Sequence, residues 1–301
     1  MRPLTRPVAL AAWLLMAPGT ALAHGGASHA LGPEWGFDPW VVVPLALSLA
    51  FYLVGTGALW RRAGIGRGIR TWQAVAYLAG WLALAGALLS PLHWWGEHVF
   101  TAHMIEHEIV MAVAAPLLVL GRPLAAGPWA WPIGLRRPLA RALTGGPAGL
   151  LWRELTRPMM ATLLHGLAIW VWHLPALFDA AVLNDTLHRL QHLSFLLSAL
   201  FFWWAMLRRS HPASAAAHLF ATMVHTGILG AVLTFAPRVM YGAQTAQAGL
   251  WGLTPLEDQQ LAGLVMWVPG GIVYAGAALA FVGLWVRRVG RWKHGHAARA
   301  R

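Results

Sequence analysis

Long, weakly charged apolar segments dominate this chain and restrict it to few folds. Seven such segments lie at about 40–60, 71–90, 99–120, 158–178, 187–207, 215–236 and 261–286. Each is close to the ~20 apolar residues that a helix needs to cross a bilayer. Because backbone groups in lipid must be hydrogen-bonded internally, only helices and closed barrels span membranes. Apolar runs of this length predict an all-α polytopic membrane protein with a seven-transmembrane-helix bundle.

The composition agrees with a lipid environment. Of 301 residues, 58% are hydrophobic and 11% are charged, whereas soluble domains average about 25% charged residues. The 19 Trp and 32 Gly fit this environment, since Trp favours membrane interfaces and Gly permits close helix packing. Cysteine is absent, which excludes disulfides, thiolate zinc sites and iron–sulfur clusters. A metal site in this chain would therefore use His, Met, Asp or Glu.

The first 23 residues have the three parts of a secretory signal peptide. Arg2 and Arg6 give a basic start, a short apolar run follows, and Ala21-Leu-Ala23 is an A-x-A cleavage pattern. An uncleaved first span is the alternative, but the apolar run is short for a membrane span. We therefore expect residues 1–23 to be a cleavable signal peptide, followed by an extracytoplasmic N-terminal tail at 24–39.

The positions of the basic residues predict the orientation of the bundle. Arginines fill the connections between spans one and two and between spans three and four, and they recur after spans five and seven. The opposite connections carry most of the acidic residues and, of the basic residues, only Arg189 and Arg238. By the positive-inside rule the basic side is cytoplasmic, so the N-terminus is outside and the C-terminus inside.

This orientation completes the expected domain organisation. The transmembrane domain covers 40–286, a basic cytoplasmic tail covers 287–301, and the longest cytoplasmic loop, 121–157, reads as a surface loop with one short amphipathic helix. The net charge of +12 is then explained by topology and by contact with anionic membrane lipid. No nucleic-acid partner is expected, and the sequence does not indicate an oligomeric state.

Two histidine pairs lie within the apolar segments. His103 and His107 open the third span, and His188 and His192 open the fifth. Residues four apart lie on one helix face, about one turn from each other, and imidazole suits copper, zinc, iron and nickel. Ionisable groups in lipid are costly and usually mark functional sites. The two pairs therefore predict a metal site that two helices build near the outer surface.

The remaining histidines have less specific patterns. His173 is near the outer end of span four, which adds a further histidine at the outer side. His93 and His98 precede span three and are equally consistent with exposed loop residues. His165 and His225 lie deeper, where a single transmembrane histidine more often hydrogen-bonds to a neighbouring helix than binds metal.

Carboxylates and thioethers extend the candidate ligand set. Glu106 and Glu108 flank His107 but point about 200° apart on a helix. One of them can ligate or orient a histidine, and the other meets polar groups across a helix interface. Asp258 at the start of span seven is a further candidate, and so is Met266, because thioethers suit Cu(I). The sequence has no G-x-S-x-G elbow, phosphate loop or H-E-x-x-H, so metal handling rather than catalysis is expected.

Three segments resemble a known family. They are the run HMIEHEIVMAVAAPLLVLGRP from His103, the segment Trp170–Pro175 with His188-x-x-x-His192 and Phe202–Trp204 after it, and the run DQQLAGLVMWVPG from Asp258. In this order they resemble the seven-helix cytochrome c oxidase assembly factors, the CtaG-like family linked to caa-type oxidases. The resemblance implies a metallochaperone of the bacterial inner (plasma) membrane that supports copper-centre maturation of a haem–copper oxidase.

The resemblance also implies a ligand set. Its members are His103, His107, His173, His188 and His192, with Asp258 and Met266 in support. Glu106 departs from the family pattern, which often has Gln at this position. The implied metal is copper as Cu(I), and the implied partners are oxidase subunits. A membrane copper or zinc transporter, in which His165 and His225 extend a path inward, and a haem-b-binding electron carrier are the alternatives.

Overall fold

The computed structural model describes residues 33–297, so the predicted signal peptide and most of the N-terminal tail lie outside the described residues. Every regular element within 33–297 is a helix. Six helices are long and apolar enough to cross a membrane, and there are seven spans if the bent pair Pro158–Trp172 and Pro175–Val182 is counted as one. The all-helical class is confirmed, and the count of seven depends on this bent pair.

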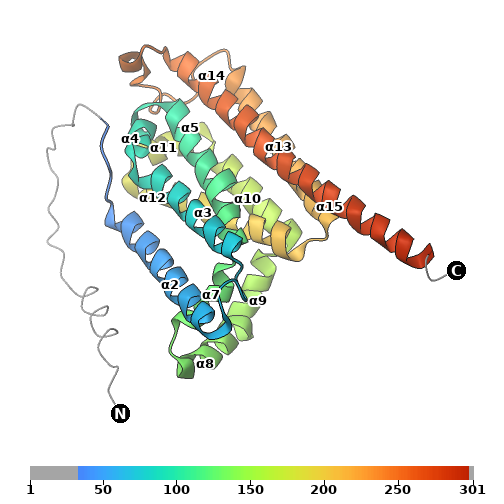
Figure 1. Cartoon of the computed structure of the whole chain (residues 1–301). Coiled ribbons are helices and arrows are strands. Elements are labelled where there is room, and N and C mark those ends of the chain that lie inside the picture. Colours follow the sequence, from blue (N-terminus) through green and yellow to red (C-terminus); the bar gives the residue numbers. More distant parts are fainter. Residues whose placement is uncertain (1–32, 298–301) are drawn as a thin grey trace. The chain divides into compact units, whose positions relative to one another are not determined.

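Figure 1 shows the arrangement of the helices, which follow the chain in this order. The first half contains α2 (Pro39–Ala63), α3 (Thr71–Leu89), α4 (Pro91–His98), α5 (Phe100–Glu108), the π-helical η1 (Ile109–Ala114), α6 (Ala115–Leu120), α7 (Pro123–Ala130), α8 (Ile133–Thr144) and α9 (Gly146–Leu155). The second half contains α10 (Pro158–Trp172), α11 (Pro175–Val182), α12 (Asp185–Trp204), η2 (Ala205–Arg209), α13 (Pro212–Thr234), η3 (Ala248–Trp251), α14 (Pro255–Val265), η4 (Met266–Gly270) and α15 (Gly271–Ala297).

The segment Phe100–Leu120 is the centre of the bundle. It comprises α5, η1 and α6, which run on as one span and contact α3, α12 and α14. Its most apolar stretch is 61% buried, compared with 22% for α2. A polar side chain on this segment is therefore surrounded mostly by protein rather than by lipid.

Prolines accompany two of the π-helical turns and the break in the fourth span. Pro116 follows η1 and Pro269 lies within η4. A proline cannot donate a backbone hydrogen bond, and wider π-helical turns accommodate the gap. Pro175 has a stronger effect, because the residue before a proline avoids the helical region: Leu174 is extended, and α11 leaves α10 at 76°. The predicted span 158–178 is therefore broken near its end.

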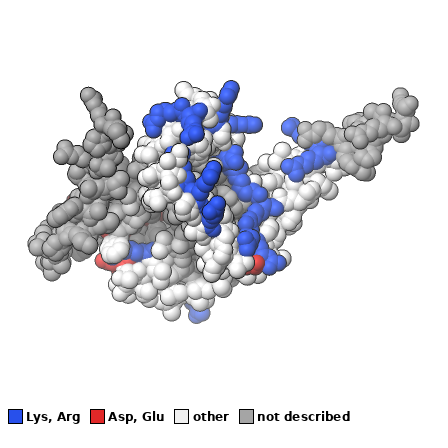
Figure 2. Space-filling view, turned by 90° about the horizontal axis from the view of Figure 1, so that it is seen from below, with Lys and Arg blue, Asp and Glu red and all other residues white. Residues whose placement is uncertain are grey.

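The basic connections meet at one end of the bundle. Arg122 donates a hydrogen bond to the Gly68 carbonyl (3.3 Å), and Arg209 donates one to the Arg153 carbonyl (3.0 Å). These bonds join the connection after α2 and the end of η2 to the segment 121–157. Figure 2 shows Lys and Arg side chains gathered on the face at this end.

The opposite end is held by other contacts. Arg189 at the start of α12 pairs with Asp38 (2.7 Å), which also caps α2. The Gly36 backbone N–H donates to the Leu89 carbonyl (3.0 Å) at the end of α3. The sequence predicts acidic residues and two arginines on this side of the bundle. One of these arginines, Arg189, forms an ion pair with one of the acidic residues, Asp38.

The connection 121–157 contains more helix than the sequence predicts. It comprises α7, α8 and α9 rather than one short helix. α7 packs closely on α2, where a Cβ at Gly55 would collide with the carbonyl of Ala126. α8 is the amphipathic element, with Arg136 and Arg137 near the exposed Ile133.

Candidate metal centre

Helices α5 and α12 turn their histidine pairs toward each other. His103 and His107 lie one turn apart on α5, and His188 and His192 lie one turn apart on α12. The ring centroids of His103 and His188 are 5.5 Å apart, and those of His107 and His192 are 4.9 Å apart. The structure therefore brings the two pairs, which are far apart in the sequence, into one cluster.

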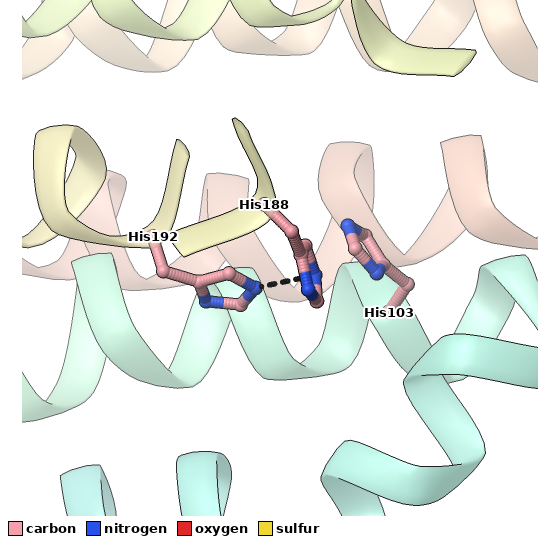
Figure 3. Close-up of side chains that lie close together, drawn as sticks. All are labelled: His103, His188 and His192. Carbon is pink, nitrogen blue, oxygen red and sulfur yellow. Dashed lines mark hydrogen bonds between the residues drawn. The ribbon is translucent and has the colours of Figure 1, made fainter. Parts of the chain in front are cut away.

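Three of these histidines have ligand atoms close enough for one ion. One nitrogen from each of His103, His188 and His192 lies within 4.8 Å of the other two. Figure 3 shows the three rings in a row, with His188 in the middle. The Nε2 atoms of His188 and His192 share a hydrogen bond of 3.0 Å. Nitrogen ligands about 2.0–2.1 Å from a tetrahedral ion are roughly 3.3 Å apart, so small ring rotations would suit a shared ion.

His107 is the inner end of the cluster. Its ring centroid is 4.2 Å from that of His103 and 4.7 Å from that of Phe195. The residue is 1% exposed, and neither ring nitrogen has a hydrogen-bond partner among residues 33–297. A buried polar group without a partner costs about 1–3 kcal/mol. A cation bound to one of the two ring nitrogens of His107 would give that nitrogen a partner and reduce the cost.

Glu106 adds a fully buried carboxylate to the cluster. Its Oε1 accepts a hydrogen bond from His93 Nδ1 (2.8 Å) and is 3.6 Å from His192 Nδ1. Burial lowers the pKa of His93, but the hydrogen bond and negative charge of Glu106 outweigh this effect and raise the pKa above its usual value. The His93 ring also stacks 5.6 Å from that of His188. His93, on the short helix α4, therefore belongs to the cluster.

A glycine on α4 makes room for this carboxylate. A Cβ at Gly96 would be 2.8 Å from Glu106 Oε2, which is too close for a real side chain.

The Gly96 carbonyl also accepts hydrogen bonds from His103 Nδ1 (3.3 Å) and from the Gln244 amide (2.8 Å). Since His103 donates through Nδ1, its Nε2 carries the lone pair. That atom has no partner in the described part of the chain and is available to a metal.

His173 lies beside the cluster but outside the group of three. It follows α10 in the break of the fourth span, and its Nδ1 donates to a backbone carbonyl one turn earlier (2.7 Å). Phe178 contacts the rings of both His173 and His103, and Phe195 contacts those of His173 and His107. The Nε2 of His173 has no hydrogen-bond partner within residues 33–297. His173 thus shares two aromatic neighbours with the cluster.

Asp258 and Met266 have other contacts. The Asp258 carboxylate accepts hydrogen bonds from the backbone N–H groups of Phe100 (2.8 Å) and Thr101 (2.9 Å) and from the Thr101 hydroxyl (2.7 Å). It therefore caps the start of α5 from α14. Met266 is 2% exposed and is part of the hydrophobic core. Neither residue is in the three-histidine group.

The deeper histidines form a separate polar set. The ring nitrogens of His165 bond to the hydroxyls of Ser198 (3.2 Å) and Tyr274 (3.1 Å). His225 Nδ1 accepts a hydrogen bond from the Trp170 indole (3.3 Å). Interhelical hydrogen bonds of this kind are the usual role of single transmembrane histidines.

Two members of the cluster are not assigned by the sequence. His93 is left undecided, although its four-residue spacing from Glu97, whose carboxylate lies 3.7 Å from it, is a signal for one helix face. Gly96 has no signature in a single sequence, because its role depends on where Glu106 points in space.

Comparison with known proteins identifies relatives of the chain. Residues 50–288, which include all the clustered histidines, match the family model described as the cytochrome c oxidase caa3 assembly factor. An uncharacterized protein of Mycobacterium bovis is 26% identical over 269 residues, and one of Mycobacterium leprae is 25% identical over 275 residues. Each alignment covers 84% of this chain but 40% of the relative, so the chain spans less than half the length of these curated relatives. No solved structure matches the chain.

Proposed function

The chain belongs to the family of cytochrome c oxidase caa3 assembly factors, and from this we propose that it binds copper at its histidine cluster and supports maturation of a copper centre in a haem–copper oxidase. The observation that carries the proposal is the convergence of His103, His188 and His192 within 4.8 Å. The copper ion is cargo in this function, and the chain performs no covalent step.

The low charge of the site, rather than its donor atoms, favours copper as Cu(I). Imidazole suits copper, and the chain has no cysteine to provide thiolates. Glu106 is the carboxylate buried against the histidines. This one carboxylate also holds His93, so a monovalent ion leaves less net charge in a site of low dielectric constant than a divalent ion would, and buried net charge is expensive.

The placement of the cluster fits delivery to an enzyme in the same membrane. The cluster lies at the end of the bundle opposite the basic face. With the basic face in the cytoplasm of a bacterial plasma membrane, the N-terminus and the histidines are on the outer side. Oxidase subunits are then the partners that receive the ion.

The proposal is tested by measuring bound metal. The full chain is purified from copper-supplied cells, and copper is determined by mass spectrometry for the wild type and for the double variants His103→Ala/His107→Ala and His188→Ala/His192→Ala. Both variants are expected to lose copper and to lower oxidase activity in the cell, while remaining in the membrane. His98→Ala is the matched control, since His98 bonds to the Trp94 carbonyl instead (2.7 Å).

Other outcomes would assign the histidines differently. Unchanged copper in both double variants would contradict the proposed site. Strong Soret and α bands in a reduced-minus-oxidised spectrum would assign the histidines to haem b. Copper uptake into proteoliposomes that His165→Ala and His225→Ala abolish would favour transport over delivery to a partner.

A further inference from the structure

A cavity adjoins the histidine cluster at the end opposite the basic face. Its volume is about 210 Å³, and it is lined by Glu97, His103, Val182, Asp185, His188 and Gln244. Two of these residues are carboxylates, and two are histidines of the three-histidine group. The Nε2 of His103, which is 1% exposed, has no hydrogen-bond partner within the described residues. The cavity thus joins acidic side chains to an available buried ligand.

Exposure falls along the side chains that lead inward from this cavity. The side chain of Glu97 is 50% exposed and that of His93 is 26% exposed, whereas His107 is 1% exposed. The ring centroid of His188 is 5.6 Å from that of His93 and 5.5 Å from that of His103, and the His103 centroid is 4.2 Å from that of His107. Nitrogen ligands therefore follow one another in short steps from the surface to the interior.

We propose that this cavity is the entrance of the copper site, where Glu97 and Asp185 attract the ion and His188 passes it to His103 and His192 by exchange of one ligand at a time. The inference rests on the proposed copper function and adds a route to it. Asp185 and His188 are three residues apart on α12, which places them on one face of the helix. An ion held by Asp185 is therefore next to the first imidazole.

The size and charge of the cavity define what can enter. A volume of about 210 Å³ has room for several water molecules but not for a folded domain. The two carboxylates attract cations and repel anionic complexes. The ion therefore leaves its carrier at the surface and enters as a hydrated cation or a small cationic complex.

The entrance is tested by the rate of copper association. The full chain in nanodiscs of zwitterionic lipid is mixed anaerobically with Cu(I) as its acetonitrile complex, and tryptophan fluorescence is followed by stopped flow. Trp94 and Trp95 are on α4, the helix that also carries His93 and Glu97, so their emission is expected to change when the ion binds. For Glu97→Gln/Asp185→Asn we expect an association rate about three- to tenfold lower at low salt, because charged clefts steer ions.

Salt and matched variants separate steering from general damage. The wild-type rate should fall as salt is raised, and the rate of the double variant should change little. Glu34→Gln removes a carboxylate outside the cavity lining and should keep the wild-type rate. Val182→Trp fills the cavity and should slow association at every salt concentration.

Two results would count against the inference in different ways. Equal rates and equal salt dependence in the wild type and the double variant, together with a wild-type rate for Val182→Trp, would overturn the entrance. If the wild type takes up no Cu(I) at all, the proposed copper function is wrong, and the entrance fails with it.

Discussion

At the scale of single residues, the position of the buried carboxylate depends on a residue that has no side chain. Glu106 holds His93 by a 2.8 Å hydrogen bond and lies 3.6 Å from His192. Gly96 leaves the space that its second oxygen fills. The negative charge of the cluster and the room for that charge therefore come from different helices.

Gly96→Ala tests this dependence. The added Cβ would lie 2.8 Å from Glu106 Oε2, so the carboxylate has to move away from its position beside His93. We expect about a tenfold loss of copper affinity, or ~1.4 kcal/mol, measured by competition with a Cu(I) chelator. Gly86→Ala is the control, because a Cβ there meets nothing within 4 Å. Wild-type affinity in Gly96→Ala would show that the carboxylate does not contribute.

At the scale of helices, α14 fixes the start of α5. Asp258 accepts hydrogen bonds from two backbone N–H groups and one hydroxyl at Phe100 and Thr101. These N–H groups are at the first turn of α5, where helices lack internal partners. The cap sets the position of the helix that carries His103 and His107, one and two turns further on.

The variant Asp258→Ala tests whether Asp258 caps α5 or binds the metal ion. Hydrogen bonds to a charged group contribute about 1.5–3 kcal/mol each, so the melting temperature should fall clearly. The number of copper ions bound at saturation should stay that of the wild type, with lower affinity, because no ligand atom is lost. Glu257→Gln is the neighbouring control, since Gln can replace Glu in the capping box of α14. A loss of copper without a loss of thermal stability would instead make Asp258 a ligand.

The elements also show what one sequence can and cannot predict. The long helices follow from apolar length, and the four-residue spacing places each histidine pair on one face of its helix. The approach of these two faces is a result of helix packing. The rule for residues before proline could have predicted the break at Leu174. The apolar run continues past this residue, however, and so indicates one unbroken span. The cap by Asp258 and the space at Gly96 depend on contacts between segments far apart in the chain, which no local pattern contains.

At the scale of the whole molecule, the histidine cluster and the basic connections lie at opposite ends of the bundle. The Arg122 and Arg209 contacts join the basic connections, and the histidine cluster lies beside the turn between α11 and α12. By the positive-inside rule we expect the cluster, and the copper that we propose for it, to lie on the outer side. This assignment decides from which compartment the ion arrives.

Cysteine labelling tests the orientation, and the chain suits it because it has no native cysteine. Leu183→Cys lies at the cluster end, where Leu183 is 78% exposed, and Gly134→Cys lies on α8 with nothing within 4 Å of its Cβ. A membrane-impermeant maleimide should label Leu183→Cys in intact spheroplasts and Gly134→Cys only after permeabilisation, and the unmodified chain should give no signal. The reverse pattern would place the cluster and its cavity in the cytoplasm. Copper would then have to come from inside the cell, and the acidic entrance would face a different set of carriers.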